Sequence, residues 1–200
     1  DISAERIIID ELSKLKKNYS ILSEETGYIK NKDEKNIWII DPIDGTSNFL
    51  HGIPHFAISI ALQSYEEIIC GLIFDPIKNE MFYAEKNNGS FFNNRRIRVS
   101  NKNDLELCLF ATNHEGSKFS DLNLRYTGCA ALDLAYVAAG RFDGFFHNSI
   151  NLWDIAAGAI IVEEAGGKTN NINKYEMQNI NIRASNTNIY SKMMEKLNNF

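Results

Sequence analysis

Two aspartates three residues apart, Asp41 and Asp44, are the side chains of this 200-residue chain best placed to do chemistry. They flank a Pro-Ile step directly after the continuous apolar run at residues 37–40. Like charges this close repel each other, and one pKa rises unless a cation lies between them. A hard divalent cation with oxygen ligands removes that repulsion. The spacing predicts a cation site, while a simple turn with Asp44 as a helix cap and Asp41 in a salt bridge remains open.

The three residues that follow Asp44 are suited to binding an anion. Gly45, Thr46 and Ser47 can open a short helix, whose backbone N–H groups then point at a negatively charged group such as phosphate. Metal ligands and a phosphate cradle in one short segment are what metal-assisted phosphoryl transfer needs.

Two further acidic positions are ordinary when taken singly. Glu24 and Glu25 follow a short apolar step, and Asp154 stands between Trp153 and a run of small residues. An aspartate at a helix start is usually a cap. Both positions therefore stay open between a structural and a ligand role.

Hydrophobic periodicity indicates short strands first and helices later, which favours a layered α/β sandwich with mixed or antiparallel sheets. A loop is expected over residues 28–36, and Pro42 is expected to end the first buried strand. Helices are expected at residues 3–17, capped by Ser3, at 130–139, at 154–165 and from 191 onward. Strands are expected at residues 37–40, 56–62, 68–74, 80–84, 90–92, 96–99, 107–111 and 142–146.

Composition sets broad limits. Hydrophobic residues make up 44% and charged residues 24%, no run could span a bilayer, and the default location is cytoplasmic. The net charge of -5 argues against a general nucleic-acid binder, so Arg95, Arg96 and Arg98 are interpreted as a solvated strand end. Three scattered cysteines support neither a disulfide framework nor a zinc site.

Taken together, these motifs resemble the inositol monophosphatase family. Residues 38–49 read WIIDPIDGTSNF and residues 153–167 read WDIAAGAIIVEEAGG, which match the two signatures of that family in order. Ser23-Glu24-Glu25 and the stretch GCAALDLAYVAAGRFDGFF extend the likeness over almost the whole chain. The resemblance implies an αβαβα sandwich of the inositol monophosphatase and fructose-1,6-bisphosphatase type. It would form a single phosphatase domain over residues 1–200, with a helix and an antiparallel metal-binding sheet in 1–100 and a second α/β half in 101–200.

The resemblance also implies a set of site residues. Mg²⁺ ions would be bound by Glu24, Asp41, the carbonyl of Ile43, Asp44 and Asp154, with Asp41 bridging them. Glu24 and Thr46 would orient the attacking water, and Asp44 would belong to the same catalytic group. Phosphate would lie on Gly45, Thr46 and Ser47, and the substrate alcohol against Gly128, Cys129, Ala130 and His147. Asp1 matches an acidic position that lies near the metals through water.

The implied reaction is hydrolysis of a small phosphate monoester, such as inositol monophosphate or a related polyol or sugar phosphate, by a possible homodimer. Three departures matter: His147 replaces a glutamate of inositol-selective members, the family has a further segment before Asp1, and residues 111–125 are shorter than usual. The alternatives are a phosphatase for 3'-phosphoadenosine 5'-phosphate or fructose 1,6-bisphosphate, and a non-catalytic regulatory relative.

Overall fold

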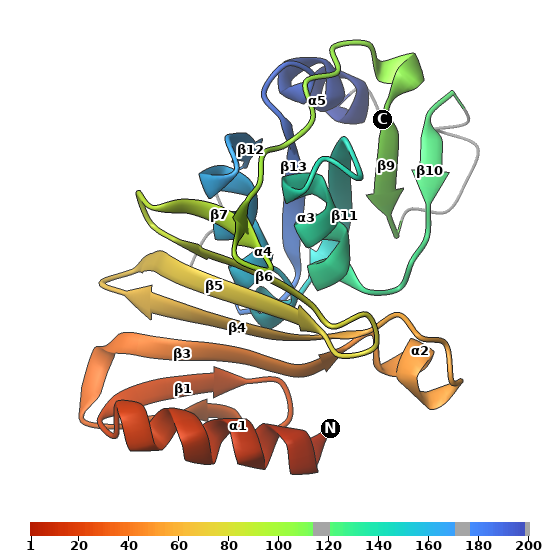
Figure 1. Ribbon diagram of the computed structural model, residues 1–200. Coiled ribbons are helices and arrows are strands. Elements are labelled where there is room, and N and C mark those ends of the chain that lie inside the picture. The colour runs from red at the N-terminus through yellow and green to blue at the C-terminus, as the bar shows by residue number, and fades with distance from the viewer. Residues whose placement is uncertain (114–120, 171–176, 199–200) are drawn as a thin grey trace.

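The computed structural model describes residues 1–113, 121–170 and 177–198, which stack as alternating layers of helix and sheet (Figure 1). α1 (Ile2–Leu15) covers the outer face of a large sheet. α3 (Ala130–Ala138) and α4 (Leu152–Glu164) lie between that sheet and a smaller one, and α5 (Tyr190–Asn198) covers the far side of the smaller sheet. This order confirms the layered α/β sandwich expected from the sequence.

The large sheet has eight strands in the order β2-β1-β3-β4-β5-β6-β7-β8. Its strands are β1 (Tyr19–Ser23), β2 (Gly27–Ile29), β3 (Asp33–Asp44), β4 (Ala57–Ser64), β5 (Glu67–Asp75), β6 (Glu80–Glu85), β7 (Gly89–Phe92) and β8 (Arg95–Arg96). β1 and β3 pair in parallel, and all other neighbours are antiparallel. The sheet of the first half is therefore mixed, as the expectation of mixed or antiparallel sheets allows, and only the β1–β3 pair departs from the antiparallel sheet that the resemblance implies. The β2 hairpin reverses the chain, and β3 then returns on the other side of β1, in the direction of β1.

The smaller sheet has five strands in the order β10-β9-β11-β13-β12. They are β9 (Leu109–Thr112), β10 (Asn123–Arg125), β11 (Gly144–Ile150), β12 (Gly167–Thr169) and β13 (Ile180–Asn186), and a 3₁₀ turn at Leu105–Leu107 precedes them. Successive side chains of this sheet serve different layers: Phe145 packs in the core around α3 and α4, while Phe146 packs with the residues of α5.

Two sequence expectations about the first strands are wrong. Residues 28–36, expected as a loop, hold the end of β2 and the start of β3, because β3 extends several residues before its apolar run. Pro42 does not end β3 either. Asp41 pairs with Ser59 and Asp44 with Ala57, so three steps on β3 match two steps on β4. This is a β-bulge, a position at which a strand tolerates proline.

Several element boundaries also differ from the expectation. α1 begins after Asp1, its N-cap residue, and ends at Leu15, while α4 begins two residues before Asp154. The strand expected over residues 96–99 is only the two-residue edge strand β8, in which Arg95 and Arg96 are exposed. β12 and β13 have no counterpart among the expected strands. The expected shortening at 111–125 falls partly on residues 114–120, outside the described chain.

The middle layer is packed closely because its helices carry small residues where they meet the layers around them. α4 is buried along nearly its whole length, as expected for a helix between two sheets. A Cβ added at Gly71 of β5 would lie 2.7 Å from the backbone of Ala157, and one at Gly158 would lie 2.5 Å from Leu134 of α3. The first contact holds the middle of α4 against the large sheet, and the second holds it against α3. No helix within the described ranges is long and apolar enough to cross a membrane.

Candidate metal centre

Three carboxylates meet where the large sheet faces the start of α4. Asp41, Asp44 and Asp154 each offer one oxygen, and these oxygens lie within 4.8 Å of one another. Residues three apart on a regular strand point to opposite faces, so Asp41 and Asp44 would be separated in an unbroken β3. The extra residue of the bulge returns both side chains to the inner face. The irregularity at Pro42 therefore builds the site.

Glu24 joins the three aspartates from the neighbouring strand. Leu22 at the end of β1 packs in the inner core, and Glu24, two residues later, continues on the same face. Its carboxyl group interacts electrostatically with that of Asp41. The parallel pairing of β1 with β3 places these two residues side by side, and this pairing is invisible in the sequence pattern.

The electrostatics of this group are those of a site that lacks positive charge. Burial, followed by the charges of Asp44, Glu24 and Asp154, raises the pKa of Asp41 to about 11. Burial, followed by the charge of Asp154, raises the pKa of Asp44 to about 7. Burial also raises the pKa of Glu24 and that of Asp154. Three hard oxygen donors held within 4.8 Å of one another, with Glu24 beside them, fit a divalent cation of the Mg²⁺ type, which would offset their repulsion.

Each aspartate is held through one contact with a backbone N–H group. Asp44 Oδ2 accepts from the N–H of Ala131 at 2.6 Å, Asp154 Oδ2 from that of Asn151 at 3.0 Å, and Asp41 Oδ1 from that of Ile43 at 2.9 Å. The Asp154 contact belongs to a capping box at the start of α4. Asp154 is therefore both a helix cap and a member of the cluster, so the two sequence interpretations do not exclude each other. An anchored carboxylate presents its other oxygen in a defined direction.

The segment after Asp44 turns sharply into the five-residue helix α2 (Thr46–Leu50). Gly45 has φ +89°, and a Cβ there would lie 3.1 Å from the carbonyl oxygen of His55 and 3.3 Å from Cβ of Cys129. Thr46 Oγ1 donates to the carbonyl oxygen of Ile43 at 2.9 Å. Only glycine combines this backbone conformation with so close an approach to the second half of the chain.

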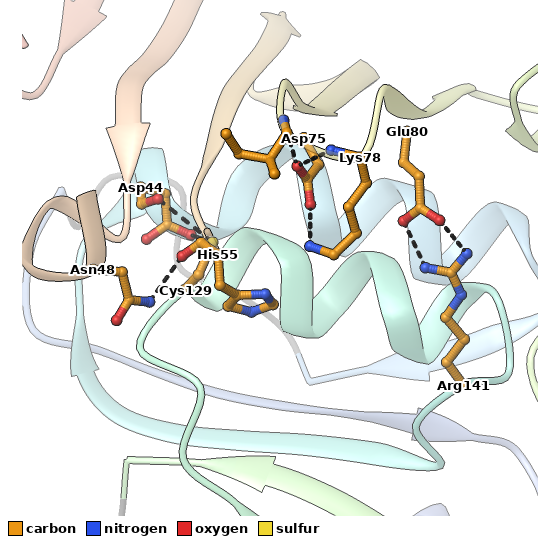
Figure 2. Close-up of polar contacts among 9 residues, drawn as sticks. Asp44, Asn48, His55, Asp75, Lys78, Glu80, Cys129 and Arg141 are labelled. Atoms are coloured by element: carbon orange, nitrogen blue, oxygen red, sulfur yellow. Dashed lines mark hydrogen bonds and ion pairs between the residues drawn. The ribbon is translucent and has the colours of Figure 1, made fainter. Parts of the chain in front are cut away.

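A second contact also joins this segment to the other half of the molecule. The side-chain amide of Asn48 donates to the carbonyl oxygen of His55 at 2.8 Å (Figure 2). It also donates to the carbonyl oxygen of Thr127 at 2.9 Å. Cys129, the N-cap residue of α3, donates from Sγ to Asp44 Oδ2 at 3.1 Å. The start of α3 is therefore clamped onto the end of β3.

A cavity of about 470 Å³ opens beside the carboxylates. It is lined by Glu24, Asp44, Thr112, Asn113, Tyr126, Gly128, Cys129, Ala130, Asp133, His147, Ser149, Ile150, Asn151 and Asp154. Seven of the residues predicted from the sequence are in this lining. Asp41 is buried and does not belong to the lining, and neither do Ile43, Gly45, Thr46, Ser47 and Asp1.

The sequence analysis missed the other seven lining residues. Thr112 ends β9, Tyr126 directly follows β10, and Ser149 and Ile150 close β11, so strand ends of the smaller sheet form one wall. Asp133 lies in the first turn of α3. An aspartate inside an otherwise apolar helix could have indicated a functional role for Asp133 from the sequence alone. The wall could not be predicted in this way, because it depends on the order and register of the strands.

Comparison with known proteins agrees with this geometry. The sequence profile of the inositol monophosphatase family matches residues 1–199. The chain belongs to the inositol monophosphatase family, a family of phosphoric monoester hydrolases. It is 38% identical to inositol-1-monophosphatase of Caulobacter vibrioides over 217 residues, covering 98% of this chain and 85% of that protein. Nus factor SuhB of Escherichia coli is 41% identical over a match that covers 84% of this chain and 68% of that protein. The crystal structure of the extragenic suppressor protein SuhB of Bartonella henselae superposes with a TM-score of 0.91 at 42% identity. The superposition covers 98% of this chain and 82% of that one.

Proposed function

We propose that this chain hydrolyses a small phosphate monoester in a Mg²⁺-dependent reaction, and that the substrate is inositol monophosphate or a related polyol or sugar phosphate. The observation that carries the proposal is the group of three aspartate oxygens within 4.8 Å of one another, beside a cavity large enough for such a molecule. Bound Mg²⁺ would supply an activated water and neutralise charge on the phosphate and the leaving oxygen.

The residues of the chain would divide this work. Glu24, Asp41, Asp44, Asp154 and the carbonyl of Ile43 would hold the cations. Glu24 would also accept a proton from the attacking water, since it lines the cavity. Its raised pKa lies closer to neutral pH than that of an ordinary glutamate, which favours proton transfer.

The other predicted residues would position the substrate. Thr46, hydrogen-bonded to the Ile43 carbonyl, would help to orient the attacking water. The backbone N–H groups of Gly45, Thr46 and Ser47 would bind the phosphate. Gly128, Cys129, Ala130 and His147 would contact the alcohol portion, since they line the cavity.

The charge of the cavity favours a substrate with one phosphate. None of the lining residues within the described chain is Lys or Arg. A second phosphate, as in fructose 1,6-bisphosphate or 3'-phosphoadenosine 5'-phosphate, would find four acidic side chains there and no fixed cation. Phosphate recognition normally uses such cations. Both bisphosphates are therefore weaker candidates.

A non-catalytic regulatory role is the second candidate function. Relatives named Nus factor SuhB, at 41% identity, favour it. Against it stand the buried carboxyl groups of Asp41 and Asp44, held close to that of Asp154, an arrangement that is costly unless a cation uses it. Metal binding without turnover on any phosphate ester would support the regulatory role.

Phosphate release from a panel of monoesters, with and without Mg²⁺, tests the proposal. Asp44→Asn keeps the shape of the side chain and removes its charge, so we expect kcat/KM to fall on the order of a thousandfold. Asp75→Asn is the matched control, because Asp75 is also buried but is bound to Lys78 outside the cavity. Full activity of Asp44→Asn, or activity without divalent metal, would contradict the site.

A further inference from the structure

Four carboxylic side chains outside the metal cluster are buried within the described chain: Glu5, Asp75, Asp133 and Asp143. Three of them have both oxygens occupied. Glu5 accepts from Ser23, Thr26 and the N–H of Glu25. Asp75 accepts from two backbone N–H groups and Lys78, and Asp143 accepts from Ser100, Lys102 and the N–H of Leu109. This is the usual condition of a buried polar group.

Asp133 differs from these three in its partners and in its surroundings. Its Oδ1 accepts from Thr127 Oγ1 at 2.7 Å, and its Oδ2 has no hydrogen-bond partner among the described residues. The side chain is only 3% exposed, yet it lines the cavity beside the metal cluster. The buried carboxyl group that lacks a second partner is thus the one that faces the substrate cavity.

Asp133 lies on the part of the cavity wall that we expect to contact the alcohol portion of a substrate. Cys129 and Ala130, one turn earlier at the start of α3, also line the cavity, and the N–H of Ala131 holds Asp44. One helical turn therefore contacts a cluster aspartate and presents a second carboxyl group to the same cavity. Burial, opposed by the Thr127 hydrogen bond, raises the pKa of Asp133, and the charge of Asp44 adds to the rise.

The rest of the wall is made of hydrogen-bonding groups without fixed charge. Asn113 and Tyr126 present an amide and a hydroxyl group, whereas the Ser149 hydroxyl already donates to Asn179 Oδ1 at 2.8 Å. A hydroxyl group of a ligand can donate to Asp133 Oδ2 and accept from such neighbours. A hydrocarbon in the same place would leave the Asp133 oxygen buried without a partner, which is unfavourable.

We propose that Asp133 is a specificity-determining residue that hydrogen-bonds a hydroxyl group on the alcohol portion of the phosphate ester. This assignment rests on the proposed phosphatase function. It predicts that Asp133 distinguishes hydroxylated from unhydroxylated alcohols, whereas the metal cluster acts equally on both.

Steady-state kinetics with Mg²⁺ on two esters test the assignment. Inositol 1-phosphate serves as the hydroxyl-rich probe, and phenyl phosphate as the probe without hydroxyl groups. In Asp133→Ala we expect KM for inositol 1-phosphate to rise roughly tenfold, with kcat/KM for phenyl phosphate unchanged within about twofold. Asp133→Asn retains a polar group and an acceptor for Thr127, so its KM should lie between those of Asp133→Ala and the native chain.

Two control variants separate recognition from folding. Thr127→Val removes the hydrogen-bond partner that Asp133 has among the described residues and leaves its carboxyl group in the cavity, so selectivity should persist. Asp143→Asn removes a buried charge away from the cavity, so it should lower Tm without changing the ratio of the two kcat/KM values. Equal loss on both esters in Asp133→Ala, with a lowered Tm, would assign a structural role and overturn the proposal.

Binding of free inositol, followed by NMR titration of the native chain and Asp133→Ala in Mg²⁺, covers the case in which no ester is hydrolysed. That case would refute the proposed function alone. Weaker inositol binding by Asp133→Ala would still support the role of Asp133. Equal binding by both proteins, or no binding by either, would overturn it.

Discussion

At the N-terminal end of α3, Asp44 lies among other carboxylates, whereas beyond its C-terminal end Glu80 is paired with Arg141 (Figure 2). The Arg141 guanidinium makes two hydrogen bonds of 2.7 Å to Glu80 and lies 4.8 Å from the ring centre of Tyr136. Asp75, between these two sites in Figure 2, is paired with Lys78 at 2.6 Å.

This comparison teaches how to distinguish structural carboxylates from functional ones. The charges of Asp75 and Glu80 are neutralised by Lys78 and Arg141. These two carboxylates therefore need no ligand from outside the protein to offset their charge. Asp41, Asp44 and Asp154 are held by backbone N–H groups but have no side-chain cation among the described residues. Their raised pKa values express the missing charge. Charge removal should therefore have opposite consequences in the two regions.

After Asp44→Asn, Asp154→Asn should produce the largest effect, because it removes a proposed metal ligand while keeping the capping contact. The amide oxygen can still accept from the N–H of Asn151, so α4 and the melting temperature should be preserved. We expect phosphatase kcat/KM to fall by about a hundredfold or more, together with Mg²⁺ affinity. Isothermal titration measures the Mg²⁺ affinity, and circular dichroism measures the helix content and the melting temperature. Normal Mg²⁺ binding by a folded variant would assign Asp154 to the cap alone.

The pH dependence of the metal-free protein should show the same missing charge. The folded-state pKa of Asp44, about 7, exceeds its ordinary unfolded value of about 4. The folded state therefore binds the proton more tightly, and the stability this contributes is lost as pH rises through 7. We expect Tm to fall by roughly 5 to 10 °C between about pH 5 and pH 8 in EDTA.

Mg²⁺ should reduce this fall, and Asp44→Asn should remove the part of it that Asp44 contributes, since neither state then has a proton to lose at this position. Differential scanning calorimetry of the native chain and the variant measures both. A stability that rises over this pH range in EDTA would show that the carboxylates are not in mutual repulsion.

Lys78→Met tests the paired region, where removing a positive charge should cost stability and leave the metal site untouched. Asp75 would remain buried with only its two backbone partners. We expect a loss of about 1 to 2 kcal/mol, or roughly 3 to 6 °C in Tm, with unchanged Mg²⁺ affinity. Lys14→Met is the control, because Lys14 pairs with Glu11 in an exposed position and its loss should leave Tm unchanged.

Arg141→Lys should have the smallest effect. It keeps the charge near Glu80 but loses the two-pronged geometry and the stacking against Tyr136, Phe92 and Phe82. We expect about 1 kcal/mol of destabilisation, measured by urea unfolding, with no change in kcat/KM. A loss of activity larger than the loss of stability would connect this pair to the metal site and weaken the comparison.

The sequence predicted the layered fold and the type of site from local features. Asp41, Asp44 and the turn at Gly45 are neighbours in the chain, so their chemistry is readable from spacing alone. Resemblance added Glu24 and Asp154, which are distant in sequence. β13 was missed although Ile180, Ile182 and Ala184 alternate inward, because its neighbours are polar and the run is short.

By itself, the sequence determined the family and predicted the oxygen-rich, cation-seeking character of the centre, since both depend on the identity and order of a few residues. Only the tertiary structure decided that Pro42 lies in a bulge, which returns Asp41 and Asp44 to one face. Tertiary structure also decided that the second half closes the cavity with Asp133. Bulge register and strand order are set by packing across the whole sheet, and no local pattern carries that information.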